Sequence, residues 1–305
     1  MRVITGGQPS KGGNGMMNRR RFLGVTASAY ALAHFNDTRA AGKLNIKLGA
    51  MGGCVMSPVT PEVFALARRI GLDGVELNIG TKVEDGKLPL ADAETCDKYR
   101  AGARANQLAI AGVVLDILHR NPLKDDPLAP GFVAQGVDIA RLMNARVLLI
   151  PIFGKGALKT REEMDRVGDI LKEHARAAEK ANLLLGLEDT ISAEDNVRIM
   201  ERIGSPAVRT YYDVGNSTNN GFDVLKEIRW LGGRRICQIH LKDQGYLGEG
   251  KIDFRQVFRT IRDSGYEGFA NFETSAPSKD READLRRNLL FTRKIMAEVE
   301  AGTRR

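Results

Sequence analysis

The chain is poor in cysteine and histidine, with 3 Cys and 4 His among 305 residues. Cys54, Cys96 and Cys237 are too few and too far apart in the sequence for a disulfide framework or a Cys-x-x-Cys metal site. We therefore expect free thiols that are buried in the core. Low-complexity tracts are also absent, and the composition is that of an ordinary globular protein.

The chain also lacks a strong membrane-spanning segment. The apolar run from Val25 to Phe35 is only mildly hydrophobic and is shorter than the ~20 residues that a membrane-spanning helix needs. We expect no stable membrane anchor.

This run follows three arginines, Arg19, Arg20 and Arg21. The order of a basic cluster and a short apolar stretch is typical of an export signal, although a disordered basic tail or an amphipathic helix would show it too. The Arg-Arg-x-Phe-Leu arrangement resembles a twin-arginine signal, with Asn18 where that pattern has Ser or Thr. Small residues suitable for cleavage lie at 31–33 and 38–40. We predict that residues 1–42 are an export signal and leader, and that the protein is periplasmic.

The net charge of +8 is concentrated in this segment. Residues 1–42 hold six basic side chains and one acidic one, so their removal lowers the net charge to +3. Proteins that bind nucleic acid gather Lys and Arg on one face, and so small a charge predicts no nucleic-acid partner.

From residue 43 onward, short apolar runs alternate with longer amphipathic segments, which is typical of βαβ units. Residues 43–305 supply about 33 residues for each of eight units, as a single (β/α)8 TIM barrel requires. An open doubly wound sheet is the alternative, but the stretch after the first strand, residues 49–53, lacks the Gly-x-Gly-x-x-Gly pattern. The eight strands are predicted at residues 46–51, 74–78, 110–115, 146–151, 183–187, 208–212, 236–240 and 268–272.

Several helix ends are marked by capping residues. Thr60 with Pro61 is expected to begin one helix, and Gly71 to end it. Thr160 with Glu163 matches a capping box, and Ser192 begins a further helix.

Four consecutive strand ends carry a group that can bind a metal. They are Glu188, Asp213, His240 and Glu273. The carboxyl ends of barrel strands converge on one mouth, where functional side chains gather. Each residue alone is explained as well by a salt bridge, a helix cap or a core histidine, but three carboxylates at one mouth repel one another unless a cation neutralises them. Three carboxylates and one imidazole suit Mn2+, with Mg2+ or Co2+ as alternatives, better than structural zinc.

The chain resembles a known family over nearly all of residues 44–298, and the resemblance is most specific in the last third of the barrel. Residues 239–243 (Ile-His-Leu-Lys-Asp), 247–254 (Leu-Gly-Glu-Gly-Lys-Ile-Asp-Phe), 265–268 and 272–274 resemble the xylose isomerase-like barrels, which include sugar isomerases and epimerases related to D-tagatose 3-epimerase. The resemblance implies one divalent metal ion on the four ligands. It also implies that Glu188 and Glu273 transfer protons on opposite faces of a carbohydrate substrate, through an enediolate.

The resemblance also indicates substrate contacts. Glu194 matches a substrate-binding glutamate, although it equally suits a helix cap. Asn216 and Tyr246 stand where the epimerases have histidine and arginine, so recognition of the sugar must differ. Lys242 and Asp243 are further candidates, and His119 is as compatible with a surface position as with the mouth.

Sugar isomerisation or epimerisation, on an unphosphorylated sugar or keto-sugar, is the function that these features favour. A lyase or dehydratase acting on an inosose or a 3-keto-glycoside would use the same enediolate. A DNA-repair endonuclease of the same superfamily needs more histidines at the early strand ends, where this chain has Ile152 and Phe153. A non-catalytic sugar-binding protein is a further alternative, because a fold does not guarantee turnover. The sequence is also compatible with a homo-oligomer.

Overall fold

The computed structural model describes residues 43–302. The predicted export signal and leader, residues 1–42, lies outside the described residues and stays a prediction.

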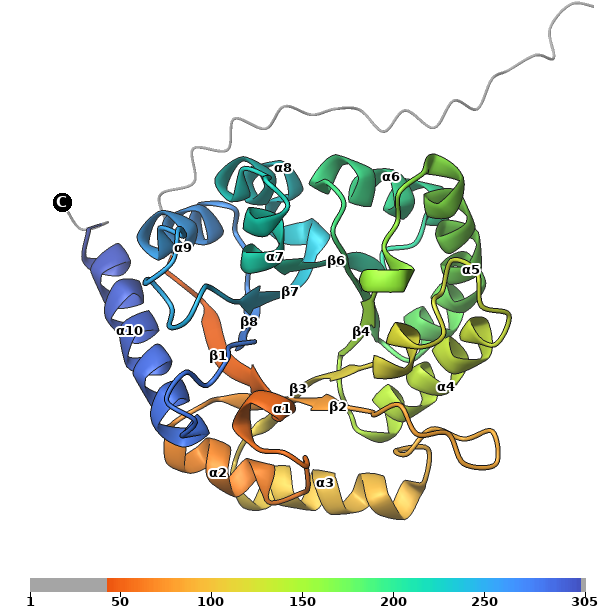
Figure 1. Cartoon of the computed structure of the whole chain (residues 1–305), viewed down its shortest axis with the longest axis horizontal. Helices are drawn as coiled ribbons and strands as arrows, with labels where there is room; N and C mark the ends of the chain where they lie inside the picture. The colour runs from red at the N-terminus through yellow and green to blue at the C-terminus, as the bar shows by residue number, and fades with distance from the viewer. Residues whose placement is uncertain (1–42, 303–305) are drawn as a thin grey trace, which may run out of the picture. The chain divides into compact units, whose positions relative to one another are not determined.

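Eight parallel strands close into a barrel in chain order, each paired with the next and β8 paired with β1 (Figure 1). The strands are β1 Ile46–Met51, β2 Gly74–Asn78, β3 Ala109–Val114, β4 Val147–Pro151, β5 Leu184–Glu188, β6 Val208–Asp213, β7 Ile236–Leu241 and β8 Gly268–Phe272. The prediction of a single (β/α)8 TIM barrel is confirmed, and each predicted strand lies within one residue of the observed one.

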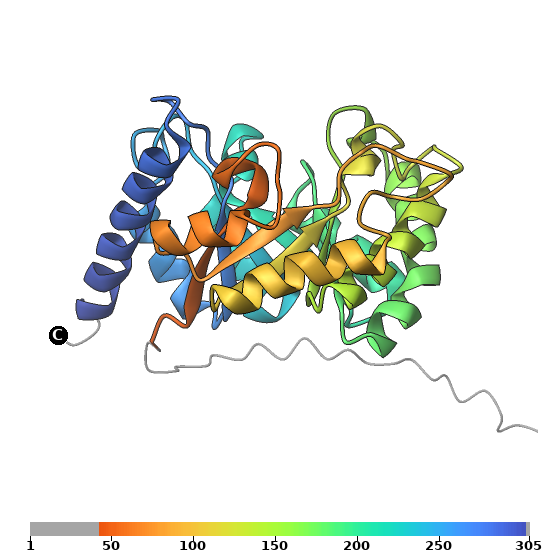
Figure 2. The ribbon, with the colours of Figure 1, turned by 90° about the horizontal axis from the view of Figure 1, so that it is seen from below.

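The longer helices lie outside the ring of strands, alongside the barrel wall, whereas two short ones directly follow strand ends (Figure 2). They are α1 Gly52–Val55, α2 Val63–Ile70, α3 Ala93–Ala105, α4 Ala129–Leu142, α5 Arg161–Lys180, α6 Ala193–Ile203, α7 Val214–Asn219, α8 Val224–Arg235, α9 Phe254–Asp263 and α10 Arg281–Ala301, with 3-10 turns η1 Asp116–His119 and η2 Gly154–Gly156. Within residues 43–302, no helix combines the length and the apolar composition needed to cross a membrane.

The predicted capping residues are confirmed at three of four helix ends. Thr160 and Glu163 form a reciprocal capping box, Ser192 caps α6, and Gly71 ends α2 with a left-handed φ of 102°. The prediction for Thr60 is wrong: α2 begins at Val63, and the Thr60 hydroxyl bonds to the Glu62 carboxylate instead of a helical N–H group.

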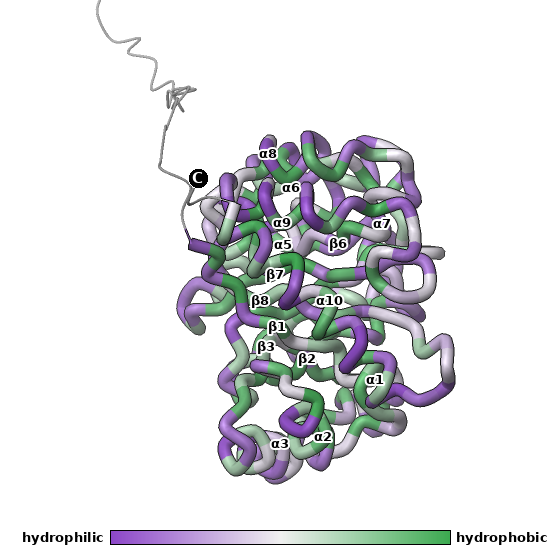
Figure 3. The backbone as a smooth tube through the Cα atoms, turned by 90° about the vertical axis from the view of Figure 1, so that its left-hand side faces the viewer, coloured by the Kyte–Doolittle hydropathy of each residue, from purple (hydrophilic) through white to green (hydrophobic). Residues whose placement is uncertain are grey.

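The strands are buried on both faces. Neighbouring residues of a strand point in opposite directions, so Leu148 and Ile150 of β4 pack in the main core under the helices, whereas Val147 and Leu149 belong to a smaller cluster inside the barrel. Figure 3 shows apolar stretches along the strands and mixed polarity along the helices. This explains why the strands appear in the sequence as nearly continuous apolar runs.

Candidate metal centre

The four predicted ligands come from four neighbouring strand ends. Glu188 and Asp213 are the last residues of β5 and β6, His240 is the penultimate residue of β7, and Glu273 directly follows β8. Asp213 and His240 are paired across β6 and β7, so their side chains start side by side. The order of the strands therefore brings the four groups together, as the sequence predicted.

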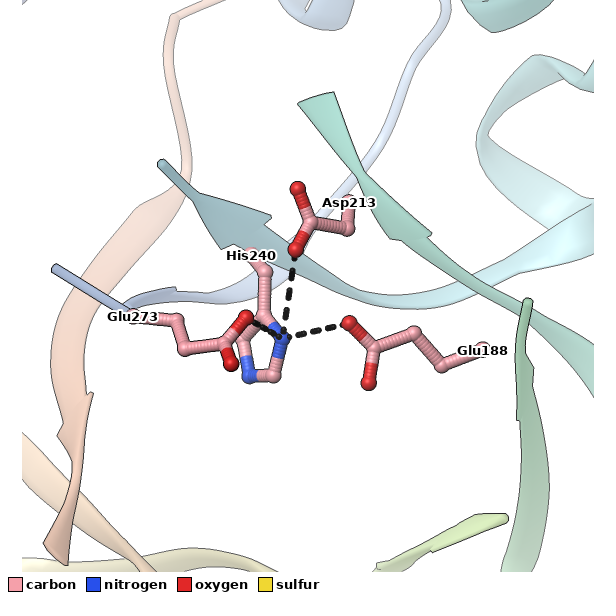
Figure 4. Close-up of side chains that lie close together, drawn as sticks. All are labelled: Glu188, Asp213, His240 and Glu273. Atoms are coloured by element: carbon pink, nitrogen blue, oxygen red, sulfur yellow. Dashed lines mark hydrogen bonds and ion pairs between the residues drawn. The ribbon is translucent and has the colours of Figure 1, made fainter. Parts of the chain in front are cut away.

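The three carboxylates converge on one atom, Nδ1 of His240 (Figure 4). Glu188 Oε1 lies 2.8 Å from Nδ1, Glu273 Oε2 3.4 Å, and Asp213 Oδ2 4.0 Å. Glu188 and Glu273 reach this atom from opposite sides. One ligand atom from each of the four residues lies within 4.8 Å of the others.

Burial and mutual repulsion set the charges of the cluster. Burial raises the pKa of Glu188, and burial together with the Glu188 charge raises the pKa of Asp213 well above its usual range. Burial would lower the pKa of His240, but the carboxylates of Glu188 and Glu76 outweigh it and raise this pKa. The site therefore concentrates carboxylates in a place where water cannot screen them.

Lys242 supplies a positive charge at the edge of the cluster. Its ammonium group lies 2.9 Å from Glu273 Oε2 and 3.6 Å from Asp213 Oδ2. Burial alone would raise the pKa of Glu273, but hydrogen bonds from His240 and Lys242 and their charges lower it. A side chain at Gly215 would collide with the Lys242 stem, because its Cβ would fall 2.7 Å from that of Lys242. Glycine at 215 thus lets Lys242 lie across the start of α7.

The donor set fits a divalent cation. Asp213 Oδ1 accepts hydrogen bonds from the backbone N–H groups of Gly215 and Asn216, whereas Oδ2 is buried and has no hydrogen-bond partner among residues 43–302. That oxygen faces the other three groups (Figure 4). A bound cation would satisfy it and would neutralise the carboxylates, and a site of three carboxylates and an imidazole suits a hard ion such as Mn2+ or Mg2+.

One carboxylate at this site was missed by the sequence analysis. Glu76, in the middle of β2, is fully buried, and its Oε2 lies 2.8 Å from Nε2 of His240. A charged residue inside an otherwise apolar strand was the available signal, but nothing in the sequence identified its partner.

The predicted substrate-binding residues lie in different surroundings. Asn216 lies in α7, and Lys242 and Asp243 directly follow β7. Lys242 and Asp243 line a cavity of about 70 Å3 together with Lys251. The Asp243 carboxylate accepts hydrogen bonds from the N–H groups of residues 244, 248 and 250 and so holds its own loop. The Tyr246 hydroxyl donates to Asp284 of α10, 2.6 Å away.

Glu194 and His119 are both exposed. Glu194 lies in the first turn of α6, where an acidic residue favours the helix, while the cap itself is Ser192. His119 ends η1 and stacks on Phe153, with ring centroids 6.1 Å apart. Substrate contacts by these residues stay predictions.

All three cysteines are free. Cys96 and Cys237 are buried, as expected, whereas Cys54 is only partly buried. Cys54 belongs to α1, which directly follows β1, and the Glu273 charge raises the pKa of its thiol while the His240 charge lowers it. Burial raises the pKa of its thiol to about 11, which keeps it protonated.

Known proteins are similar to this chain in sequence and in fold. A 2-epi-5-epi-valiolone 7-phosphate 2-epimerase of Actinoplanes sp. is 28% identical over 226 residues, which cover 68% of this chain and 80% of that protein. An L-ribulose-5-phosphate 3-epimerase of Escherichia coli is 27% identical over 68% of this chain and 79% of its own length. The crystal structure of a 3-keto-D-glucoside 4-epimerase from E. coli superposes with a TM-score of 0.68 at 14% identity, covering 82% of this chain and 99% of that one.

The family is shown by a match over most of the chain. Residues 64–295 match the family model described as xylose isomerase-like TIM barrel. This range runs from α2 to α10 and includes all four residues of the candidate metal centre and Glu76. The chain therefore belongs to the xylose isomerase-like TIM-barrel family.

Proposed function

We propose that the protein is a divalent-metal-dependent sugar isomerase or epimerase that moves a proton through an enediolate. The observation that carries the proposal is the placement of two glutamates, Glu188 and Glu273, on opposite sides of a buried cluster of metal ligands (Figure 4). A sugar carbon held between them would have a carboxylate on each face. The names of the sequence relatives, which are sugar epimerases, support the same class of reaction.

The two glutamates have different surroundings, as an acid and a base need. Glu273 is partly exposed and lies beside the Lys242 ammonium, which favours its ionised form, the form that can accept a proton. Glu188 is almost fully buried, and burial raises its pKa, so of the two carboxylates it would take up a proton more readily and could return one to the sugar. Pairs of carboxylates whose pKa values differ in this way are typical of acid–base catalysis.

Asp213 and His240 would hold the cation together with the two glutamates. A divalent cation bound there supplies Lewis acidity to the carbonyl and hydroxyl oxygens of a sugar. Return of the proton to the same carbon from the opposite face gives an epimer, and its return to the neighbouring carbon gives aldose–ketose isomerisation.

The substrate we propose is an unphosphorylated sugar or keto-sugar. The Actinoplanes and E. coli sequence relatives are named for phosphorylated substrates, whereas the structural neighbour is named for a 3-keto-glucoside. The proposal for an unphosphorylated substrate rests on the predicted export of the protein, because sugar phosphates belong to the cytoplasm. Signal cleavage and periplasmic location are part of the same proposal.

The test is solvent exchange. The protein is incubated with Mn2+ in deuterium oxide together with ketoses, 3-keto-glycosides and their phosphorylated counterparts, and the products are analysed by NMR after removal of the metal. The proposal predicts deuterium at one carbon of an unphosphorylated sugar, with no loss of mass. Glu188→Gln and Glu273→Gln should each reduce the exchange at least ~100-fold.

Glu282→Gln is the control, because this glutamate lies on α10 and pairs with Arg69 and Arg286. Its exchange rate should equal that of the wild type. Loss of water or of an aglycone would establish elimination instead of isomerisation. Mn2+ binding without exchange on any sugar would favour a binding protein.

A further inference from the structure

A chain of buried hydrogen bonds lies inside the barrel, directly below the metal centre. Asn271 Nδ2 of β8 donates to the Tyr211 hydroxyl of β6 and to Gln238 Oε1 of β7, each over 2.9 Å. Tyr211 in turn lies 2.9 Å from Oε1 of Glu76. Each of these side chains is almost completely buried.

The positions of these residues follow from the strand period of two. Tyr211, Gln238 and Asn271 each precede a metal ligand, respectively Asp213, His240 and Glu273, by two residues. Side chains two apart on a strand share a face, so the network forms the layer immediately beneath the ligands.

Glycines on neighbouring strands leave room for this layer. A Cβ at Gly49 would fall 2.2 Å from Asn271 Oδ1, and a Cβ at Gly112 would fall 3.3 Å from Glu76 Oε1. Both glycines pair with members of the network, Gly49 with Asn271 and Gly112 with Glu76. Polar groups here take space that aliphatic side chains fill in an ordinary barrel.

The network fixes the direction of its hydrogen bonds. The Tyr211 oxygen accepts a hydrogen from the Asn271 amide, so the single hydroxyl hydrogen of Tyr211 points to Glu76 Oε1. Glu76 therefore accepts at Oε1, and its other oxygen is left to accept from Nε2 of His240, 2.8 Å away.

We infer that Glu76 is a positioning residue for the metal ligand His240. By accepting the Nε2–H of the imidazole, it would keep the hydrogen of a metal-bound His240 on Nε2 and leave Nδ1, which faces Glu188, Asp213 and Glu273, for the cation. The Tyr211 ring, with its centroid 4.5 Å from that of His240, also limits rotation of the imidazole. Carboxylates that accept from a metal-bound histidine fix its tautomer and raise its basicity.

The inference rests on the proposed metal centre, and Mn2+ binding to the complete protein tests both. Glu76→Gln keeps the size of the side chain but removes its charge, and Mn2+ should bind ~10- to 100-fold more weakly. Glu227→Gln is the matched control, since Glu227 is another buried carboxylate that accepts from a tyrosine, Tyr212, 2.9 Å away, and from the N–H of Ala193. This control should bind Mn2+ as tightly as the wild type.

The tautomer of His240 gives a second measurement, independent of activity. In protein labelled with 15N-histidine and loaded with diamagnetic Mg2+, NMR should place the ring hydrogen on Nε2. If Glu76→Gln does not fold, the tautomer measurement on the wild type still tests the role of Glu76. Mn2+ titration of Tyr211→Phe is the second test, and this variant should weaken binding less than tenfold.

The outcomes separate the two proposals. A wild type that binds no Mn2+ would remove the metal centre itself. A wild type that binds Mn2+, with Glu76→Gln binding equally well or with the hydrogen on Nδ1, would overturn the role of Glu76 alone.

Discussion

Asp189 follows the candidate metal ligand Glu188 but has quite different contacts. Its Oδ1 accepts from the Ile191 N–H and from Asn196 Nδ2, each over 3.1 Å. Its Oδ2 is buried and lacks a hydrogen-bond partner in the described part of the chain. Burial raises the pKa of Asp189 to about 7. The residue thus carries its hydrogen in the folded protein at a pH at which the unfolded chain has lost it.

The unfolding free energy should therefore depend on Asp189 between pH 4 and 7. Because the folded-state pKa is raised, the contribution is fully present below the unfolded value of 3.8 and is lost as the pH rises towards 7. A folded-state pKa that lies one pH unit above the unfolded-state pKa corresponds to about 1.4 kcal/mol, so the loss amounts to a few kcal/mol. Urea unfolding of Asp189→Asn across this range should show a shallower decline than the wild type. Identical slopes would contradict the assignment.

The sequence alone predicts the surroundings of some residues of the site but not of others. The proximity of the four candidate ligands could be predicted because each stands at a strand end, and strand ends are visible in a single sequence. Glu76 was missed because its partners Tyr211 and His240 are 135 and 164 positions away. A substrate contact by Tyr246 stays a prediction; its hydroxyl donates to Asp284 and its ring lies under Arg287, and both belong to α10, which is far away in the sequence.

At the scale of whole elements, caps that act within three residues were predictable. Thr160 accepts from the Glu163 N–H, and the Glu163 carboxylate accepts from the Thr160 N–H. All of this information lies in four consecutive residues. The predicted helix start at Thr60 was wrong. The Thr60 hydroxyl donates to the Glu62 carboxylate instead of accepting from a helical N–H group, and α2 begins only at Val63.

The capping box gives a prediction for α5. Thr160→Ala removes the acceptor for the Glu163 N–H group and should lower the free energy of unfolding by about 1 kcal/mol. Thr160→Ser retains the hydroxyl and should remain within a few tenths of the wild type. Chemical denaturation of the three proteins measures both differences. An alanine variant as stable as the serine variant would show that the cap contributes nothing.

The strands were predicted more accurately than the short elements between them. Strands buried on both faces give continuous apolar runs, which have no close equivalent in loops. The turns α1, α7, η1 and η2 each span three to six residues and follow strand ends, where no periodicity can develop. Their positions depend on contacts made by the closed barrel, such as the packing of Gly215 of α7 against Lys242, which directly follows β7.

At the scale of the whole molecule, closure of the barrel determines the site. Eight parallel strands follow one another around the ring, so β5 to β8 occupy adjacent positions and bring their ends to one mouth. The ring order could be predicted because successive βαβ units are usually neighbours. The distances between the side chains could not, because they depend on strand register, including the irregularities between β2 and β3 and between β6 and β7.

The charge of the closed site predicts that a cation stabilises the fold. Four buried or partly buried carboxylates, Glu76, Glu188, Asp213 and Glu273, surround His240 and Lys242. Mn2+ at 100 times its Kd should add about 2.7 kcal/mol of stability, which raises Tm by roughly 5–10 °C in a domain of this size. Scanning calorimetry with Mn2+ and then with a chelator measures the shift. In Asp213→Asn the shift should shrink, and a wild type indifferent to both additions would contradict the prediction.

The most direct test of the metal centre is X-ray diffraction from crystals soaked in Mn2+, recorded at the manganese absorption edge. The account predicts one strong anomalous peak within coordinating distance of Glu188, Asp213, Nδ1 of His240 and Glu273, with Nε2 still facing Glu76. A map without a peak at the barrel mouth, or with these side chains directed away from one another, would contradict it.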